Sequence, residues 1–186
     1  MIDLSEIIEN CKREHKPSQK KLFETYSPVL YGICVRYVSD KQEANDILQD
    51  GFIKIFRNIN DYSGIGSFEG WMKRIMVNTA ITHFHQNKKH NNHIEISEIE
   101  DYHADESQYE SQKSDYTKEE LSKIIKDLPS GYRVVFNLYA IEGYSHKEIA
   151  EMLEIAEPTS KSQYSRAKKL IRKKLEQISA IKKIQI

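Results

Sequence analysis

Apolar residues recur at spacings of three and four over residues 44–59, and this periodicity limits the possible folds more than any other feature of the sequence. The spacing places one apolar stripe on a single helical face, formed by Ala44, Ile47, Leu48, Phe52, Ile55, Phe56 and Ile59. Helical spacing recurs before and after this segment, and no segment alternates apolar and polar residues long enough to predict a strand. Only 7 Gly and 4 Pro are present, few for the turns of a β-sandwich. The sequence therefore predicts an all-α fold.

Polar and breaking residues suggest where the helices of the first half begin and end. Ser18 is a candidate N-cap for a helix to Tyr37, and Pro28 should kink or divide that helix. Asp40 and Glu43 have the spacing of a capping box at the start of the next helix. Ser67 is expected to cap a third helix, which would end near residue 86.

Residues 87–116 lack an apolar period and are rich in polar and acidic residues, which is typical of a linker. The whole chain is formally neutral, with 28 Lys and Arg against 28 Asp and Glu. That neutrality combines an acidic block over residues 94–120 with a basic block over residues 161–175. We predict two small helical domains, residues 1–86 and 117–186, joined by a flexible acidic linker.

The sequence offers little for catalysis, metal binding or membrane insertion. No apolar run approaches the ~18 residues that span a membrane. Neither a signal peptide nor a disulfide framework is expected, which predicts a cytoplasmic protein. His83 and His85 would diverge by about 200° on a helix and do not favour a shared metal. With no Walker loop, nucleophile motif or HExxH, we expect neither an enzyme nor a cofactor, metal or small-molecule substrate.

Residues 143–159 have the pattern of a helix-turn-helix. Ser145 and Glu148 form a predicted capping box, and Ile149 and Leu153 should face inward from the short helix. A brief turn follows, and Pro158 suits the first turn of the next helix because its missing N–H has no helical partner there.

The second helix of this unit separates a core face from a polar face. The polar face carries hydroxyls, an amide and cations, on Thr159, Ser162, Gln163 and Arg166, flanked by Lys161, Ser165 and Lys169. Such groups pair with base edges and phosphates in a major groove. The alternative is a solvated face of a basic helical hairpin. The basic run over residues 168–174 suits phosphate contacts or solvation better than base recognition.

Two distant motifs resemble the compact extracytoplasmic-function (ECF) sigma factors, which retain regions 2 and 4. Residues 44–56 and 67–80 carry the first motif, and residues 143–150 and 159–168 carry the second. The resemblance covers about residues 20–178. It implies a bacterial protein that binds core RNA polymerase through the β′ clamp helices and the β flap, and directs it to −35 and −10 promoter DNA. The resemblance also implies control by an anti-sigma factor.

The resemblance assigns roles to particular residues. Polymerase docking is expected at Asp46, Gln49, Asp50 and Lys54, with a solvated face as the alternative. Recognition and melting of the −10 element fall to Tyr62, Ser63, Lys73, Arg74 and Asn78. Recognition of the −35 element falls to Ser145, Thr159, Lys161, Ser162, Gln163, Ser165, Arg166 and Lys169. The acidic linker would either mimic nucleic-acid charge in a polymerase channel or act as a solvated tether. Phe68 and Trp71 suit core packing better than base stacking.

Several residues depart from the family pattern. Glu154 stands where a turn glycine is usual, which predicts a less strained or differently shaped turn. Ala156 replaces a Ser or Thr cap, a loss of ~1 kcal/mol, and Gly51 lies inside a helix at a similar cost. A rival function is a stand-alone helix-turn-helix regulator, but residues 18–86 lack the βα alternation of a receiver domain.

Overall fold

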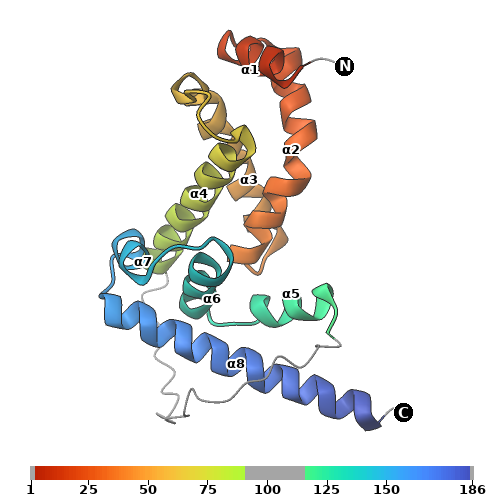
Figure 1. The fold of residues 1–186 in the computed structure, drawn as a ribbon, viewed down its shortest axis with the longest axis vertical. Helices are drawn as coiled ribbons and strands as arrows, with labels where there is room; N and C mark the ends of the chain where they lie inside the picture. The colour runs from red at the N-terminus through yellow and green to blue at the C-terminus, as the bar shows by residue number, and fades with distance from the viewer. Residues whose placement is uncertain (1–2, 91–115, 185–186) are drawn as a thin grey trace.

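The structure is a computed structural model that describes residues 3–90 and 116–184, and every regular element in these two ranges is helical (Figure 1). The all-α prediction is confirmed. The first range contains α1 (Leu4–Lys12), α2 (Lys16–Tyr37), α3 (Lys41–Arg57), the 3₁₀ turn η1 (Ile59–Asp61) and α4 (Phe68–His90). The second contains α5 (Lys118–Lys126), α6 (Ser130–Phe136), the π-helical turn η2 (Asn137–Ile141), α7 (His146–Leu153) and α8 (Glu157–Ile184). The predicted acidic linker falls mostly outside the described residues.

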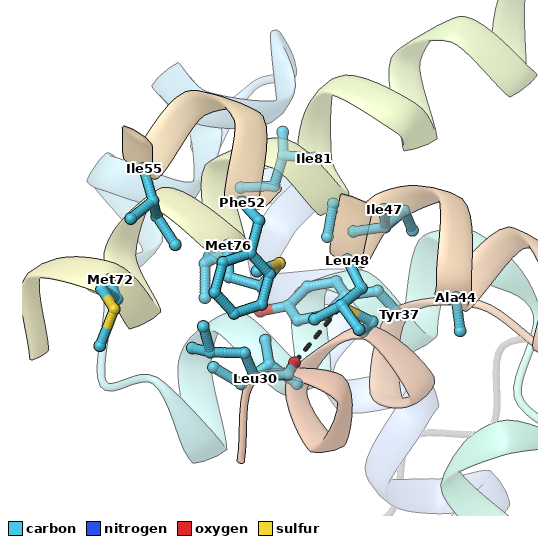
Figure 2. Packing of buried hydrophobic residues seen from close by; sticks show 14 of the residues in the cluster. Leu30, Tyr37, Ala44, Ile47, Leu48, Phe52, Ile55, Met72, Met76 and Ile81 are labelled. Carbon is cyan, nitrogen blue, oxygen red and sulfur yellow. Dashed lines mark hydrogen bonds between the residues drawn. The ribbon is translucent and has the colours of Figure 1, made fainter. Parts of the chain in front are cut away.

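Helices α2, α3 and α4 pack together around the predicted apolar stripe of α3. Figure 2 shows Ile47 and Ile55 of α3 in a cluster with Leu30 of α2 and with Met72 and Met76 of α4, and all five are fully buried. Helix α1, which the sequence analysis did not predict, covers the N-terminal part of α2 and buries two side chains of its own, Ile8 and Cys11.

The structure corrects the predicted N-cap of α2 and excludes one of the two effects expected of Pro28. The N-cap is His15, with Pro17 in the first turn, whereas Ser18 is inside the helix and its Oγ lies 2.9 Å from His15 Nδ1. Pro28 does not divide the helix, which continues to Tyr37. Pro28 and Glu24, whose carbonyl group would have paired with an N–H at position 28, are both exposed, so water can solvate that carbonyl.

Asp40 caps α3 as predicted, and its carboxylate accepts hydrogen bonds from the backbone N–H groups of Gln42 and Glu43. Glu43 does not complete the predicted capping box, because its carboxylate lies 3.5 Å from Nδ2 of Asn87 on α4 instead of bonding to the N–H of Asp40. Ser67 caps α4 by accepting a hydrogen bond from the N–H of Gly70. The starts of α3 and α4 are therefore fixed by local side-chain bonds.

The second described range contains the helix-turn-helix, which is formed by α7 and α8. Ser145 and Glu148 make both bonds of the predicted capping box, and Ile149 and Leu153 are buried. Before it lie α6 and η2, a π-helical turn. Gly143, with φ of +81°, ends this segment.

The turn between α7 and α8 keeps a left-handed residue without a glycine. Glu154 has φ of 54° and ψ of 47°. The expectation of a less strained or differently shaped turn is therefore wrong, because Glu154 itself takes the left-handed conformation. Pro158 lies in the first turn of α8 as predicted, and Ala156 accepts the first helical hydrogen bond through its carbonyl oxygen, from Ser160.

Candidate functional site

A polar face on α3 lies opposite the core. Asp46, Gln49 and Asp50 are exposed, whereas Ile47 and Leu48 between them are buried. Lys54 is half-buried one turn further along, beside a depression that α3 shares with α4. The four residues predicted for docking thus lie along one helix, and none is needed in the core.

His83 and Ile53 extend this α3 face, and the sequence analysis did not assign either of them to it. His83 on α4 places Nε2 3.7 Å from Oδ2 of Asp50. Ile53 is 47% exposed, an apolar residue among charged neighbours. In the sequence, Ile53 is an apolar residue that does not follow the spacing of three and four shared by the buried residues of α3.

The loop before α4 is a small closed turn. Gly64 and Gly66 have φ of +78° and +81°, and the Tyr62 hydroxyl donates to the Gly66 carbonyl at 2.8 Å. Ile65, between the two glycines, is 86% exposed, more than any other large apolar residue in the described ranges. Left-handed backbone favours glycine, so the two glycines fix a shape that carries Ile65 outward.

Aromatic side chains support this loop from beneath. Phe68 is buried and lies 5.0 Å from the Tyr62 ring and 5.5 Å from Trp71, measured between ring centroids. Trp71 is half-buried and packs on the same core. The expectation of core packing is confirmed for Phe68, while Trp71 keeps part of its ring at the surface.

Helix α4 presents the other residues predicted for the −10 element. Arg74 and Asn78 are exposed and one turn apart. Lys73 is half-buried and its Nζ lies 2.6 Å from the carboxylate of Glu69. Ser63 is exposed in the loop that precedes α4, and Lys73 and Arg74 lie in the first two turns of this helix, with Asn78 one turn further along.

The N-terminus of α7 is ordered by its capping box and by aromatic packing. The Ser145 hydroxyl lies 2.7 Å from the Glu148 carboxylate. His146, which the sequence analysis left unassigned, stacks on Tyr139 at 4.2 Å, and its Nδ1 lies 2.9 Å from Ser160 Oγ. Burial lowers the pKa of His146, and the nearby charge of Lys161 lowers it further. His146 therefore joins the two helices of the unit through Ser160.

The polar face of α8 consists of two adjacent rows. The exposed residues are Lys161, Ser162, Ser165 and Lys169. Thr159, Gln163 and Arg166 are half-buried, and the last two lean towards the start of α6. Nη1 of Arg166 lies 3.5 Å from the Tyr132 hydroxyl, and Lys161 pairs with Glu157 at 2.7 Å.

Histidine and cysteine side chains point to different elements. His83 faces α3, whereas Nε2 of His85 lies 3.0 Å from the Met152 carbonyl oxygen on α7, so the predicted divergence is confirmed. Over residues 3–90 and 116–184, no three His, Cys, Asp or Glu side chains are grouped as metal ligands would be.

Cys11 and Cys34 are buried free thiols. None of the helices in these ranges is long and apolar enough to cross a membrane.

Comparison with known families gives two matches in the predicted order. Sigma-70 region 2 matches residues 22–90, and sigma-70 region 4 matches residues 118–171. Together they cover most of the chain and include both the α3–α4 surfaces and the helix-turn-helix. The match over the first range sets aside the rival of a regulator built on the helix-turn-helix alone.

Curated relatives are similar over nearly their whole length. The RNA polymerase sigma-H factor of Pseudomonas aeruginosa is 28% identical over 92% of this chain and 93% of its own. The ECF RNA polymerase sigma-E factor of Haemophilus influenzae is 27% identical over 91% of this chain and 94% of its own. Among solved structures, the sigma factor RpoE of Bartonella quintana, crystallised with the anti-sigma factor NepR, is 20% identical over 84% of this chain and 96% of its own, with a TM-score of 0.49. The two region matches, in this order and over most of the chain, place the protein in the sigma-70 family as an RNA polymerase sigma factor of the ECF type, a transcription initiation factor and not an enzyme.

Proposed function

We propose that the exposed face of α3 is the surface that docks on the β′ clamp helices of core RNA polymerase. Asp46, Gln49, Asp50 and Lys54 supply its charges and amide, and Ile53 supplies apolar area at its centre. Interfaces of this kind combine an apolar centre with a polar rim. The observation that carries the proposal is that these exposed side chains share one helix with a fully buried opposite face, so docking leaves the core unchanged.

The Tyr62–Ser67 loop and the adjoining part of α4 are proposed to open and bind the −10 element. A base that leaves the duplex is stabilised by apolar or aromatic protein surface, and the adjoining phosphates are stabilised by cationic side chains. Tyr62 and Ile65 offer the first, Ser63 adds a hydroxyl, and Lys73, Arg74 and Asn78 offer cations and an amide beside them. Support comes from the rigid loop geometry, in which the aromatic cluster holds the loop on the core.

The helix-turn-helix is proposed to bind the −35 element as duplex. Ser162, Ser165, Lys161 and Lys169 would meet the groove and backbone first, because they are exposed. The half-buried residues Thr159, Gln163 and Arg166 would line the edge nearest α6, and Ser145 would meet a phosphate at the N-terminus of α7. Contact of this domain with the β flap, and an anti-sigma factor that covers these surfaces, complete the proposal. Its place of action would be the bacterial cytoplasm, with the polymerase.

Binding to core polymerase tests the docking surface directly. The double substitution Asp46→Ala with Gln49→Ala should abolish co-elution with core polymerase while leaving helicity and thermal unfolding unchanged. A matched control is Lys20→Ala with Glu24→Ala, which removes an exposed ion pair of α2. Co-elution of the α3 variant at wild-type levels would show that this face does not dock.

A further inference from the structure

Helix α8, which carries most of the residues proposed for the −35 element, begins without a side-chain cap. It follows Ala156, whose methyl group cannot accept a hydrogen bond from the N–H groups of the first turn. Helix α7 begins with both bonds of the capping box between Ser145 and Glu148. The turn between the two helices holds Glu154 in the left-handed conformation, which is unfavourable for a residue with a β-carbon. The start of α8 is therefore held less by local bonds than the start of α7.

The imidazole of His146, the first residue of α7, contacts the first turn of α8. Its Nδ1 lies 2.9 Å from Oγ of Ser160, 14 residues further along the chain. Ser160 is fully buried, and a buried hydroxyl is destabilising unless it has a hydrogen-bond partner. The bond therefore fixes the first turn of α8 against the start of α7.

Aromatic packing holds the imidazole of His146 in place. The ring stacks on Tyr139 of η2, with centroids 4.2 Å apart and an interplanar angle of 12°. Tyr164, one turn beyond Ser160 on α8, has its centroid 5.8 Å from that of the imidazole and 4.5 Å from that of Tyr139. Aromatic pairs of this kind attract one another beyond the area that they bury. His146 thus contacts η2 and two successive turns of α8.

These contacts lie next to residues proposed for base recognition. Thr159 and Lys161 flank Ser160, and Gln163 precedes Tyr164. A rotation of α8 by about 20° would move a side-chain end about 6 Å from the helix axis by about 2 Å. A hydrogen bond to a base edge does not survive such a shift, because its donor–acceptor distance is confined to about 2.7–3.2 Å. The imidazole therefore lies where it controls how α8 presents its polar face.

Contacts with phosphates tolerate the same shift better. Lys161 and Lys169 are exposed, and the long lysine side chain is flexible. The attraction between a cation and a phosphate also falls gradually with distance. Phosphate contacts carry no sequence information directly. A misplaced α8 should hence lose recognition of the −35 sequence before it loses attraction to DNA in general.

We propose that His146 is a positioning residue for recognition of the −35 element. Its bond to Ser160 and its packing against Tyr139 and Tyr164 hold α8 at the angle that lets the polar face reach the base edges. His146 acts through α8 and needs no base contact of its own. This role rests on the proposed binding of the −35 element by the helix-turn-helix.

Two promoters that differ only in the −35 element test this role with the holoenzyme, formed from core polymerase and the full chain. One promoter used by the holoenzyme keeps its −35 sequence, and in the other that sequence is replaced while the −10 element is unchanged. The ratio of their rates of open-complex formation measures −35 recognition. His146→Ala should lower this ratio roughly tenfold, as expected for the loss of one good base contact. The rate on the promoter with the replaced −35 sequence should stay at the wild-type value.

A double-substitution cycle isolates the bond with Ser160. His146→Phe keeps an aromatic ring on Tyr139 but leaves the buried Ser160 hydroxyl without this partner, and Ser160→Ala removes the hydroxyl. Each substitution alone should lower the ratio. The two together should restore part of it, because both polar partners are then replaced by apolar groups. Glu151→Ala, at an exposed position of α7, is the matched control and should leave both rates unchanged.

The outcomes separate this role from the proposed function. A His146→Ala protein that is folded by circular dichroism and keeps the wild-type ratio overturns the positioning role while −35 binding stands. Equal losses on both promoters also overturn it, because they indicate a general defect in folding or polymerase binding. If His146→Ala does not fold, the cycle decides, and losses that simply add in the double variant contradict the role. Equal wild-type rates on the two promoters would instead overturn the proposed −35 binding, and the role of His146 with it.

Discussion

Gly51 of α3 lies directly against Met76 of α4: a β-carbon at Gly51 would be 2.5 Å from both Sδ and Cε of the methionine. Both residues are buried, so the thioether has little room to move. The glycine departs from the family pattern and weakens α3 as a helix, yet it allows α3 and α4 to approach closely. That approach positions the proposed docking face on α3 relative to the proposed DNA face on α4.

Gly51→Ala should therefore lower the free energy of unfolding by about 1 kcal/mol, because overpacking of about 1–3 kcal/mol outweighs a gain of about 1 kcal/mol in helix propensity. Urea denaturation followed by circular dichroism measures the change. In a Met76→Val background, which removes Sδ and Cε, the same substitution should be neutral or stabilising. An equal loss in both backgrounds would contradict the steric explanation.

Glu154→Gly should stabilise the protein by about 0.5–1 kcal/mol, since glycine adopts the left-handed conformation of this turn without the penalty of a β-carbon. The larger freedom of glycine in the unfolded chain keeps the gain small. Glu151→Gly, at an exposed position inside α7, is the control and should destabilise by about 1 kcal/mol. If Glu154→Gly and Glu151→Gly lower the free energy of unfolding equally, the left-handed conformation of Glu154 does not destabilise the protein.

Local sequence patterns predicted the helices well where a cap and an apolar stripe coincide. Asp40, Ser67 and Ser145 all begin helices as expected, because each side-chain bond joins residues only two or three positions apart. Helix α1 was missed although Ile8 and Cys11 follow helical spacing. It is only 9 residues long, and much of its stability comes from packing on α2.

Features that depend on distant contacts could not be predicted in the same way. Asn137 and Arg36 are 101 residues apart, and nothing near either residue shows that they pair. The residues of α3 proposed for docking were correctly placed off the core, because burial on a helix follows from periodicity. Gln163 and Arg166 were assigned to the groove face, yet their lean towards α6 depends on tertiary packing.

The capping boxes predict a pH dependence of stability. The pKa of Glu148 is lowered by hydrogen bonds from the Ser145 side chain and backbone, and that of Glu120 by bonds from the Thr117 backbone and from Lys182. Each folded pKa is below the unfolded value of 4.5. Their stabilising contribution is therefore present above pH 4.5 and is lost as the pH falls through the folded pKa.

Thermal unfolding from pH 7 to pH 3 measures this loss. Glu148→Gln should unfold at a lower temperature than the wild type at pH 7, and the difference should shrink as the pH falls below 4.5. Glu151→Gln, at an exposed position of the same helix, is the control. A difference that stays constant across the range would exclude the ionised capping box as its source.

Ile65→Ser should separate folding from promoter opening. The side chain is 86% exposed, so stability should change by less than about 0.5 kcal/mol. Loss of the apolar contact with unstacked bases should slow formation of the open complex, measured by permanganate reactivity of promoter thymines. A promoter with a pre-melted −10 region should restore the wild-type rate. An unchanged rate on duplex promoter would remove Ile65 from the opening step.

Transcription in vitro with core RNA polymerase of the same organism, with and without this protein, tests whether the chain directs transcription initiation. Fragmented genomic DNA serves as template, and start sites are mapped by sequencing the transcripts. We expect start sites that appear only with the protein and share two upstream motifs at −35 and −10 spacing. Absence of new start sites, together with tight binding of the protein alone to duplex DNA, would contradict the sigma-factor assignment and favour a stand-alone regulator.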